Sequence, residues 1–217
     1  TDIEGSTRRW ELQRAAMSAA LERHDEILRA AIEGHGGRVF KTVGDAFYGA
    51  FGDPRGALVA ALAAKRQLRA QDWAAYGSAI AGLRVRMAIH HGAVEARGGD
   101  YFGPALNRAA RLVAAGHGGQ ILVSMSAQQV LREFLPGGVV LRDRGEHRLR
   151  DLRHKEHIWE VVAGGLQEVV RPLVTAERSG PRDRITVGDT GARSASQRWN
   201  TASKSALMRV RTFCAFR

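Results

Sequence analysis

The stretch RVFKTVGDAFYGAF, residues 38–51, decides the fold class. Residues 38–43 have the composition of a strand, Gly44 and Asp45 form a turn signal, and residues 46–51 have the composition of the returning strand. The two strands of a hairpin are antiparallel. Elsewhere the chain alternates helices with strands, so this central hairpin favours an α+β architecture over a purely parallel α/β one.

Hydrophobic periodicity predicts the remaining elements. Four helices are expected at 11–33, 54–72, 104–115 and 126–134, the last capped by Ser126, and four strands at 83–89, 121–123, 139–141 and 157–162. This order predicts an α+β sandwich, a mostly antiparallel sheet with helices packed on it, related to the ferredoxin-like split βαβ. A strand leading into Asp2 would need apolar residues before Thr1, so we expect the first strand to be missing from this sequence.

The composition is that of a globular protein of ordinary domain size. The chain has 217 residues, of which 44% are hydrophobic and 25% charged. No apolar run approaches the ~20 residues of a membrane span, and the start has no signal-peptide pattern. Cys214 is the only cysteine, so an intrachain disulfide is impossible. We therefore predict a cytoplasmic protein without membrane attachment.

The positive charge is unevenly distributed along the chain. The net charge is +11, yet residues 167–217 alone contain ten Lys or Arg against four Asp or Glu. Residues 178–205 are polar and have few apolar side chains, and 207–216 regain apolar content without a period, compatible with a short helix, a docking segment or no fold. We predict a folded domain at 1–165 and a basic, mostly disordered tail or linker at 166–217.

Two carboxylates are the first candidates for a functional site. Asp2 lies in TDIEGST, residues 1–7, and Asp45 lies at the turn of the hairpin. Each sits where an extended segment meets a turn, so both can project past one edge of a sheet. Converging carboxylates make a hard-oxygen site for Mg²⁺ or Mn²⁺. Taken alone, an Asp beside Gly is more often a turn or cap residue.

Four separated motifs strengthen this interpretation. They are TDIEGST at 1–7, KTVGDAFYGAF at 41–51, DYFGPALNRAAR at 100–111 and GEHRLRDL at 145–152. In this order they resemble the catalytic domain of class III nucleotidyl cyclases, most closely the bacterial branch that opens with TDIEGST. The resemblance covers about residues 1–165. It implies conversion of a nucleoside triphosphate to a 3′,5′-cyclic monophosphate and pyrophosphate.

The resemblance also implies roles for individual residues. Asp2, Asp45 and the backbone carbonyl of Ile3 are expected to hold two Mg²⁺ or Mn²⁺ ions per active site. Arg111 matches the arginine that stabilises charge on the α-phosphate, which suits the fixed fork of a guanidinium. Asn107 matches the residue that orients the ribose. If residues 104–115 are helical, these two side chains share one face, although an ordinary solvated polar face would look the same.

Base choice is argued from hydrogen-bond polarity. Lys41 and Asp100 occupy positions that look like the purine-selecting pair of the family, and a cationic donor with a carboxylate acceptor matches the edge of adenine. Lys41 taken in isolation would be a solvated strand lysine. The family usually has Lys where this chain has Arg150, so charge is kept while geometry differs. We predict an adenylate cyclase that acts on ATP, with Arg150 contacting the polyphosphate.

The spacing of the motif residues supports a homodimer. Lys41 and Asp45 lie about 13 Å apart in an extended strand, which is far for one compact site. In the family each site forms between two protomers, with the metal-binding aspartates from one chain and the base pair, Asn and Arg from the other.

Three other functions remain open from the sequence. They are a guanylate or relaxed-specificity cyclase, a non-catalytic regulatory module of a larger transcriptional regulator, and a nucleic-acid-binding protein. The last is motivated by charge alone. The sequence lacks a recognition-helix or aromatic-platform signature, so we do not expect nucleic acid to be a partner of the folded domain.

Overall fold

The computed structural model describes residues 1–166, 171–175 and 212–215. Its strands are β1 (Asp2–Ile3), β2 (Gly37–Val43), β3 (Ala46–Phe51), β4 (Val85–His90), β5 (Glu95–Arg97), β6 (Asp100–Phe102), β7 (Ile121–Ser124), β8 (Val139–His147), β9 (Glu156–Ala163) and β10 (Thr212–Ala215). Its helices are α1 (Ser6–Leu12), α2 (Arg14–Glu33), α3 (Pro54–Ala70), α4 (Pro104–Ala115) and α5 (Met125–Leu131), with a 3₁₀ turn at Ala74–Tyr76.

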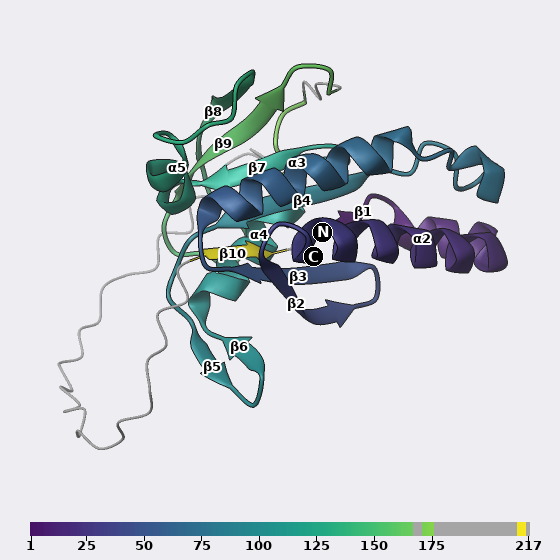
Figure 1. Ribbon diagram of the computed structural model, residues 1–217, viewed down its shortest axis with the longest axis horizontal. Coiled ribbons are helices and arrows are strands. Elements are labelled where there is room, and N and C mark those ends of the chain that lie inside the picture. Colours follow the sequence, from purple (N-terminus) through teal and green to yellow (C-terminus); the bar gives the residue numbers. More distant parts are fainter. Residues whose placement is uncertain (167–170, 176–211, 216–217) are drawn as a thin grey trace, which may run out of the picture.

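One mixed sheet forms the centre of the fold, with the order β2-β3-β10-β4-β7-β9-β8 and with β1 paired to β4 (Figure 1). The β4–β7 pair is parallel, and the other pairs in this sheet are antiparallel. The hairpin predicted from residues 38–51 is β2–β3, with Lys41 opposite Tyr48. The predicted α+β sandwich with a mostly antiparallel sheet is therefore confirmed.

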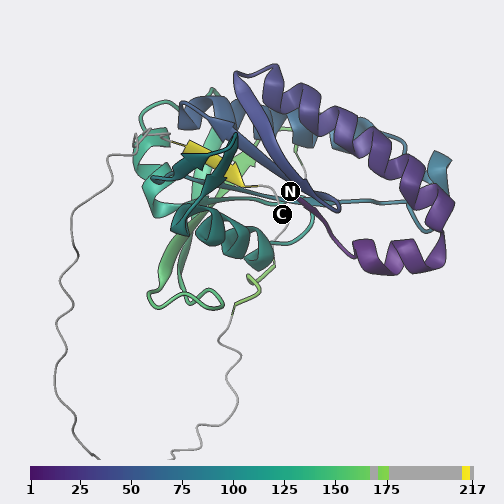
Figure 2. The same cartoon turned by 90° about the horizontal axis from the view of Figure 1, so that it is seen from below.

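Helices cover both faces of the sheet, as Figures 1 and 2 show. Met87 and Ile89 of β4 pack in the large core beneath α2 and α3. Ala88, between them, packs in the smaller core beneath α4. Side chains of a strand alternate between its faces, and this alternation was visible in the sequence. It also places Arg86 on the α4 side, where the candidate site lies.

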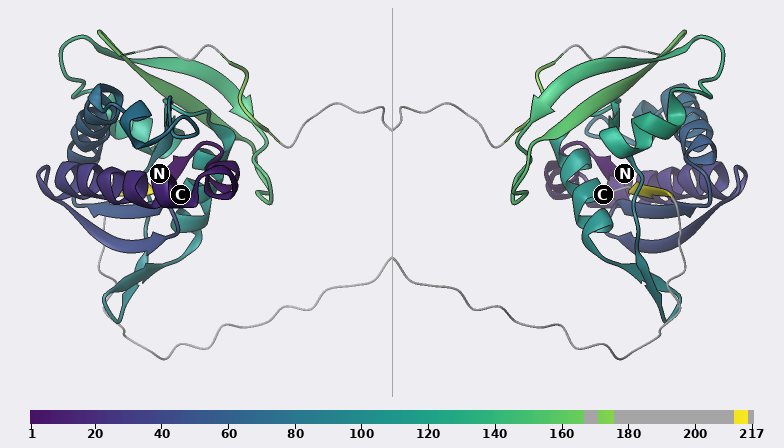
Figure 3. Two further views of the ribbon diagram at one scale, coloured as in Figure 1. Left: turned by 90° about the vertical axis from the view of Figure 1, so that its right-hand side faces the viewer. Right: turned by 90° about the vertical axis from the view of Figure 1, so that its left-hand side faces the viewer.

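Two local predictions were wrong, and one small element was missed. The helix expected at 11–33 is two helices, because Gln13 has φ −147° and ψ 77° and its side chain accepts a hydrogen bond from Ala79 N at 3.2 Å. Helix α5 is capped by Ser124 rather than Ser126, since Ser124 Oγ accepts from Ala127 N. The small hairpin β5–β6 was not predicted; in Figure 3 it projects on the opposite side from the long β8–β9 ribbon.

Strand β10 fills the central gap of the sheet. Cys214 pairs with Gly49 of β3 on one side and with Ile89 of β4 on the other. Along β4, β10 and β1 run in the same direction, with Ala215 opposite Ala88 and Asp2 opposite Arg86. This segment was left open between a short helix, a docking segment and no fold. The disorder predicted for 178–205 falls outside the described residues.

None of the described helices is long and apolar enough to cross a membrane.

Candidate active site

A cavity of about 620 Å³ lies where β1, the β2–β3 turn, β4 and α4 meet. Its lining includes five polar side chains: Asp2, Asp45, Arg86, Asn107 and Arg111. Four of these were predicted site residues, so the structure gathers widely separated motifs around one space. The cavity combines two carboxylates with two guanidinium groups.

The two carboxylates are brought together by strand β1. Its pairing with β4 sets Asp2 opposite Arg86, and the guanidinium of Arg86 donates a hydrogen bond to the Asp2 carboxylate. The backbone N–H of Ile3 donates to Oδ2 of Asp45 at 2.7 Å. This bond ties β1 to the turn of the β2–β3 hairpin. Both carboxylates therefore face the same cavity, as predicted.

The residues present fit a divalent ion that arrives together with a nucleotide. Among the described residues there is no group of three or more His, Cys, Asp or Glu side chains that could hold a metal by themselves. Mg²⁺ commonly takes one or two carboxylates and completes its octahedral shell with substrate phosphates and water. Asp2, Asp45 and the carbonyl of Ile3 offer hard oxygen donors of this kind.

Helix α4 supplies the opposite wall of the cavity. It begins after Gly103 with Pro104 in its first turn, and Asn107 and Arg111 lie one turn apart. Both line the cavity, so they share one helical face as expected from their spacing. Arg111 is not free: its Nη2 lies 2.6 Å from Oδ2 of Asp151, in the connection between β8 and β9.

The predicted base-selecting residues are in direct contact. Lys41 Nζ of β2 lies 3.1 Å from Oδ2 of Asp100 of β6. The rings of Phe40 and Tyr101, the neighbouring residues, meet edge to face with centroids 4.8 Å apart and hold the two strands together. The backbone N–H of Tyr101, and secondarily Lys41, hold the pKa of the Asp100 carboxyl below its ordinary value. Neither Lys41 nor Asp100 lines the 620 Å³ cavity.

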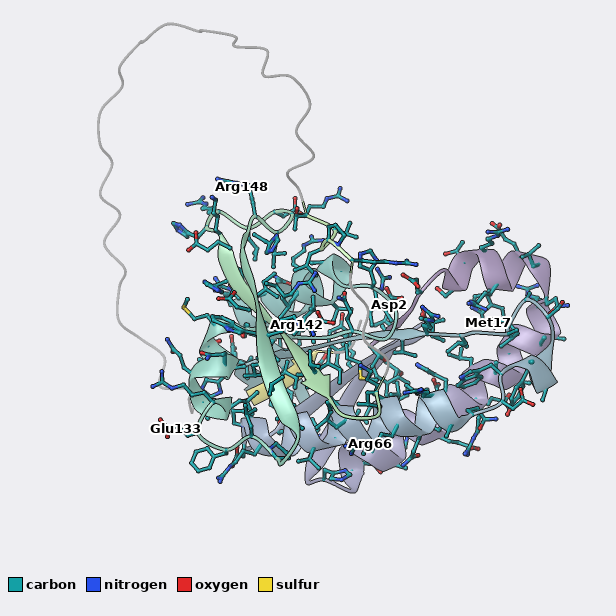
Figure 4. The ribbon with its side chains drawn as sticks, turned by 90° about the horizontal axis from the view of Figure 1, so that it is seen from above. Asp2, Met17, Arg66, Glu133, Arg142 and Arg148 are labelled. Atoms are coloured by element: carbon teal, nitrogen blue, oxygen red, sulfur yellow. The ribbon has the colours of Figure 1, made fainter. Side chains whose placement is uncertain are left out.

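Arg150, the predicted polyphosphate contact, lies on the β8–β9 connection and is 83% exposed. Its Nε is 3.9 Å from the same Asp151 carboxylate that binds Arg111. Figure 4 shows Arg148 at this end of the ribbon and Asp2 near the centre of the molecule. The connection therefore brings positive charge to one end of the molecule, close to Arg111.

Sequence reasoning missed two charged groups at this site. Arg86 is one of the polar residues alternating along β4, and its sequence context carried no sign that it would bind Asp2. Asp151 belongs to the motif GEHRLRDL, which drew attention to Arg150 instead. A second cavity, of about 360 Å³, lies between the end of α3 and the start of β4 and contains none of the predicted residues.

Two carboxylates facing an asparagine and an arginine, on a sheet of this topology, define a site suited to nucleotide phosphates. The family described as the adenylate and guanylate cyclase catalytic domain matches residues 1–162, and the chain belongs to this family. Domains of this family generally use divalent metals, bind a nucleotide substrate and typically form dimers.

Similar proteins with known sequences include an uncharacterized protein of Mycobacterium tuberculosis and an adenylate cyclase of Schizosaccharomyces pombe. The first is 33% identical over 180 residues, covering 82% of this chain and 59% of that protein. The second is 33% identical over 221 residues, covering 83% of this chain and 13% of that protein. The chain thus spans about three fifths of the mycobacterial relative and a small part of the fungal enzyme.

Solved structures of cyclases share the fold. The adenylyl cyclase CyaB of Pseudomonas aeruginosa has a TM-score of 0.63 at 23% identity, covering 80% of this chain and 93% of that one. An adenylate cyclase of Trypanosoma brucei has a TM-score of 0.64 at 22% identity, with coverages of 81% and 92%. The guanylate cyclase domain of RhGC from Catenaria anguillulae, solved with GTP, has a TM-score of 0.57 at 19% identity, with coverages of 75% and 92%.

Proposed function

We propose that this chain is an adenylate cyclase that converts ATP to 3′,5′-cyclic AMP and pyrophosphate. In this reaction the ribose 3′-oxygen loses its proton and bonds to the α-phosphorus. The bond from that phosphorus to the oxygen bridging the β-phosphate breaks, and pyrophosphate leaves. The observation that carries the choice of adenine is the contact of Lys41 with Asp100.

This pair offers the polarity that adenine needs. The ammonium of Lys41 can donate to N1 of adenine, and the carboxylate of Asp100 can accept from the 6-amino group. Guanine carries a donor at N1, which would face the donor of Lys41 and leave both donors unpaired. The low pKa of the Asp100 carboxyl keeps it ionised, and therefore an acceptor, at neutral pH. These features favour ATP over GTP.

The groups around Arg111 suit the phosphate end of the substrate. A guanidinium can bind two oxygens of the α-phosphate at once and stabilise the charge that develops there during transfer. Asn107, one turn earlier on α4, would orient the ribose. Arg150 does not line the cavity, but its Nε lies 3.9 Å from the Asp151 carboxylate that also pairs with Arg111, and we propose that it contacts the polyphosphate.

Asp2, Asp45 and the carbonyl of Ile3 would hold two Mg²⁺ or Mn²⁺ ions. When bound, such ions lower the pKa of the attacking hydroxyl and neutralise the triphosphate. The chain itself holds the two carboxylates in place by the bond from Ile3 N to Asp45 and by the pairing of β1 with β4. When a cation binds to the Asp2 carboxylate, the ion pair between Arg86 and Asp2 must break.

We propose further that the working unit is a homodimer with sites shared between protomers. The cavity of one chain contains the aspartates, Asn107 and Arg111, but not Lys41 or Asp100. A single chain thus lacks base-recognition groups in the space where its carboxylates gather. A second copy of the chain would supply them, along with its own Asn107 and Arg111.

The test is cyclic nucleotide formation from ATP and from GTP, with Mn²⁺ and with Mg²⁺. We expect cyclic AMP from the unmodified chain and a loss of at least about 100-fold in Asp45→Asn, because one metal-binding carboxylate is removed. Asp143→Asn is the matched control, since this exposed carboxylate binds His157 and lies outside the cavity.

Lys41→Ala tests the base preference separately. It should lower the ATP rate more than the GTP rate, because it removes the donor that adenine needs and guanine does not. Formation of cyclic GMP from GTP at a rate equal to or above that of cyclic AMP from ATP would replace the adenylate assignment with a guanylate or relaxed-specificity one. No product from either nucleotide in a folded, dimeric sample would contradict the enzyme assignment.

A further inference from the structure

Asp151 pairs closely with Arg111 and lies within ion-pair distance of Arg150, the two arginines that are proposed to contact substrate phosphates. Its Oδ2 lies 2.6 Å from Nη2 of Arg111 and 3.9 Å from Nε of Arg150. A carboxylate in this position carries negative charge and paired oxygen acceptors, as a phosphate does. In the described structure these two guanidinium groups are thus brought together around an anion that belongs to the chain.

The backbone at Asp151 makes this contact unusual. Asp151 has φ 60° and is the one non-glycine residue with positive φ among those described. It is the third residue of a turn closed by a hydrogen bond from Leu152 N to Leu149 O at 3.2 Å. Glycine suits such a position best, although Asp tolerates it better than most residues do. The turn is anchored by buried Leu149 and directs a carboxylate at Arg111.

The exposure of the Asp151, Arg111 and Arg150 side chains indicates that a phosphate can replace the Asp151 carboxylate in its contact with Arg111. The side chains of Asp151 and Arg150 are 60% and 83% exposed, and that of Arg111 is 31% exposed. Ion pairs with solvent-exposed members contribute little net stability because water competes for both charges. A polyphosphate carries more charge than one carboxylate and can displace it. Asp151 would then oppose binding by a small factor rather than block it.

We propose that Asp151 is an internal substitute for a substrate phosphate, which holds Arg111 while the site is empty and is displaced when a polyphosphate binds. This inference rests on the proposed role of Arg111 in phosphate binding. It makes Asp151 a residue that tunes affinity through Arg111 and takes no part in the chemistry. The charges are reversed at Asp2. There the guanidinium of Arg86 pairs with a carboxylate that is proposed to hold a cation.

The experiment measures binding of inorganic pyrophosphate to the full chain by calorimetry at fixed, low ionic strength. Asp151→Asn keeps the size of the side chain and removes its charge. Asp151→Gly also removes the charge and, in addition, suits the positive φ of this position. We expect both to tighten binding two- to fivefold. Asp143→Asn removes an equally exposed carboxylate that binds His157 and should leave the affinity unchanged. Circular dichroism checks that each variant is folded.

A double-mutant cycle separates competition from a structural role. In an Arg111→Ala background, Asp151→Asn should tighten binding by much less than it does in the unmodified chain. Unchanged or weaker binding in both Asp151 variants, with Arg111→Ala weakening it, would overturn the inference and leave the proposed function standing. If Arg111→Ala does not weaken pyrophosphate binding, the inference about Asp151 is wrong, while the proposed function still depends on whether the chain forms cyclic AMP from ATP. Tighter binding in a chain that makes no cyclic nucleotide would support Asp151 while contradicting the enzyme assignment.

Discussion

At the scale of single residues, His90 shows how burial sets a charge state in this fold. Its side chain is almost fully buried at the end of β4, where Nδ1 lies 2.9 Å from Oγ of Ser124. Burial, followed by the positive charge of Arg108 and then His91, lowers the pKa of His90 from 6.5 to about 4. The imidazole is therefore neutral in the folded protein at neutral pH.

This shift predicts a loss of stability in mild acid. Below pH 6.5 the unfolded chain binds a proton at His90, while the folded chain stays neutral until about pH 4. The contribution of His90 is thus complete above pH 6.5 and falls by about 1.4 kcal/mol per pH unit towards pH 4. Urea unfolding should show about 2 kcal/mol less stability at pH 5 than at pH 7 from this group.

The control compares two histidine variants. His90→Gln should remove this part of the pH dependence, whereas His154→Gln, at an exposed position, should keep it. The same loss of stability between pH 7 and pH 5 in His90→Gln and in the unmodified chain would show that His90 is not its source.

The candidate site residues that could be predicted from the sequence lie within recognisable motifs. Asp2 and Asp45 share a cavity, as expected, and Lys41 contacts Asp100, the residue with which the resemblance pairs it. Their roles in catalysis stay predictions. The partners of these residues were harder to foresee. Asp151 reaches Arg111 because of a turn with positive φ, and a string of residue types does not reveal that conformation.

At the scale of elements, β10 has the greatest structural consequence. Among the described strands, it is the one that pairs with both β3 and β4. The β2–β3 hairpin carries Lys41 and Asp45, and β4 pairs with the strand that carries Asp2. Strand β10 therefore joins the two halves of the sheet that must be aligned for the two carboxylates to meet.

This position predicts that a proline in β10 will destabilise the domain. Cys214 pairs on both sides, so Cys214→Pro removes a backbone donor in the interior of the sheet. We expect a cost of about 3 kcal/mol or more, and therefore a Tm lower by roughly 10 °C for a domain of this size. Cys214→Ala keeps the backbone donor and is the matched control. Equal Tm values for the two variants would show that β10 does not hold the sheet together.

Strand β10 also shows which elements the sequence could predict. Helix α4 begins at Pro104 and ends at Ala115 as expected, because a proline, an apolar stripe and a following glycine mark its limits. Four residues of β10 are too few for a period, and their strand conformation depends on β3 and β4. The break at Gln13 likewise depends on a distant partner, the backbone of Ala79. Tertiary contacts decide such elements, and local patterns do not.

At the scale of the whole molecule, the central question is whether one chain or two build each site. One chain gathers Asp2, Asp45, Asn107 and Arg111 around a single cavity, while the Lys41–Asp100 contact lies outside its lining. Two arrangements fit this geometry. Either Arg111 serves the carboxylates of its own chain, or it serves those of a partner, as we propose for a homodimer with shared sites.

Mixing two inactive variants distinguishes these arrangements. Asp45→Ala removes a carboxylate and Arg111→Ala removes the phosphate-binding arginine, so each alone should lose at least about 100-fold in activity. If the two residues of one site come from different chains, each mixed dimer contains one site with both residues intact. Equal mixing with full exchange then makes half of the dimers mixed, and about a quarter of the original activity should return. If both residues come from one chain, every site in the mixture lacks one of them, and activity should stay at the level of the single variants. Cyclic AMP formation before and after mixing, with sedimentation to confirm dimers, therefore decides whether this molecule needs its partner for chemistry or only for assembly.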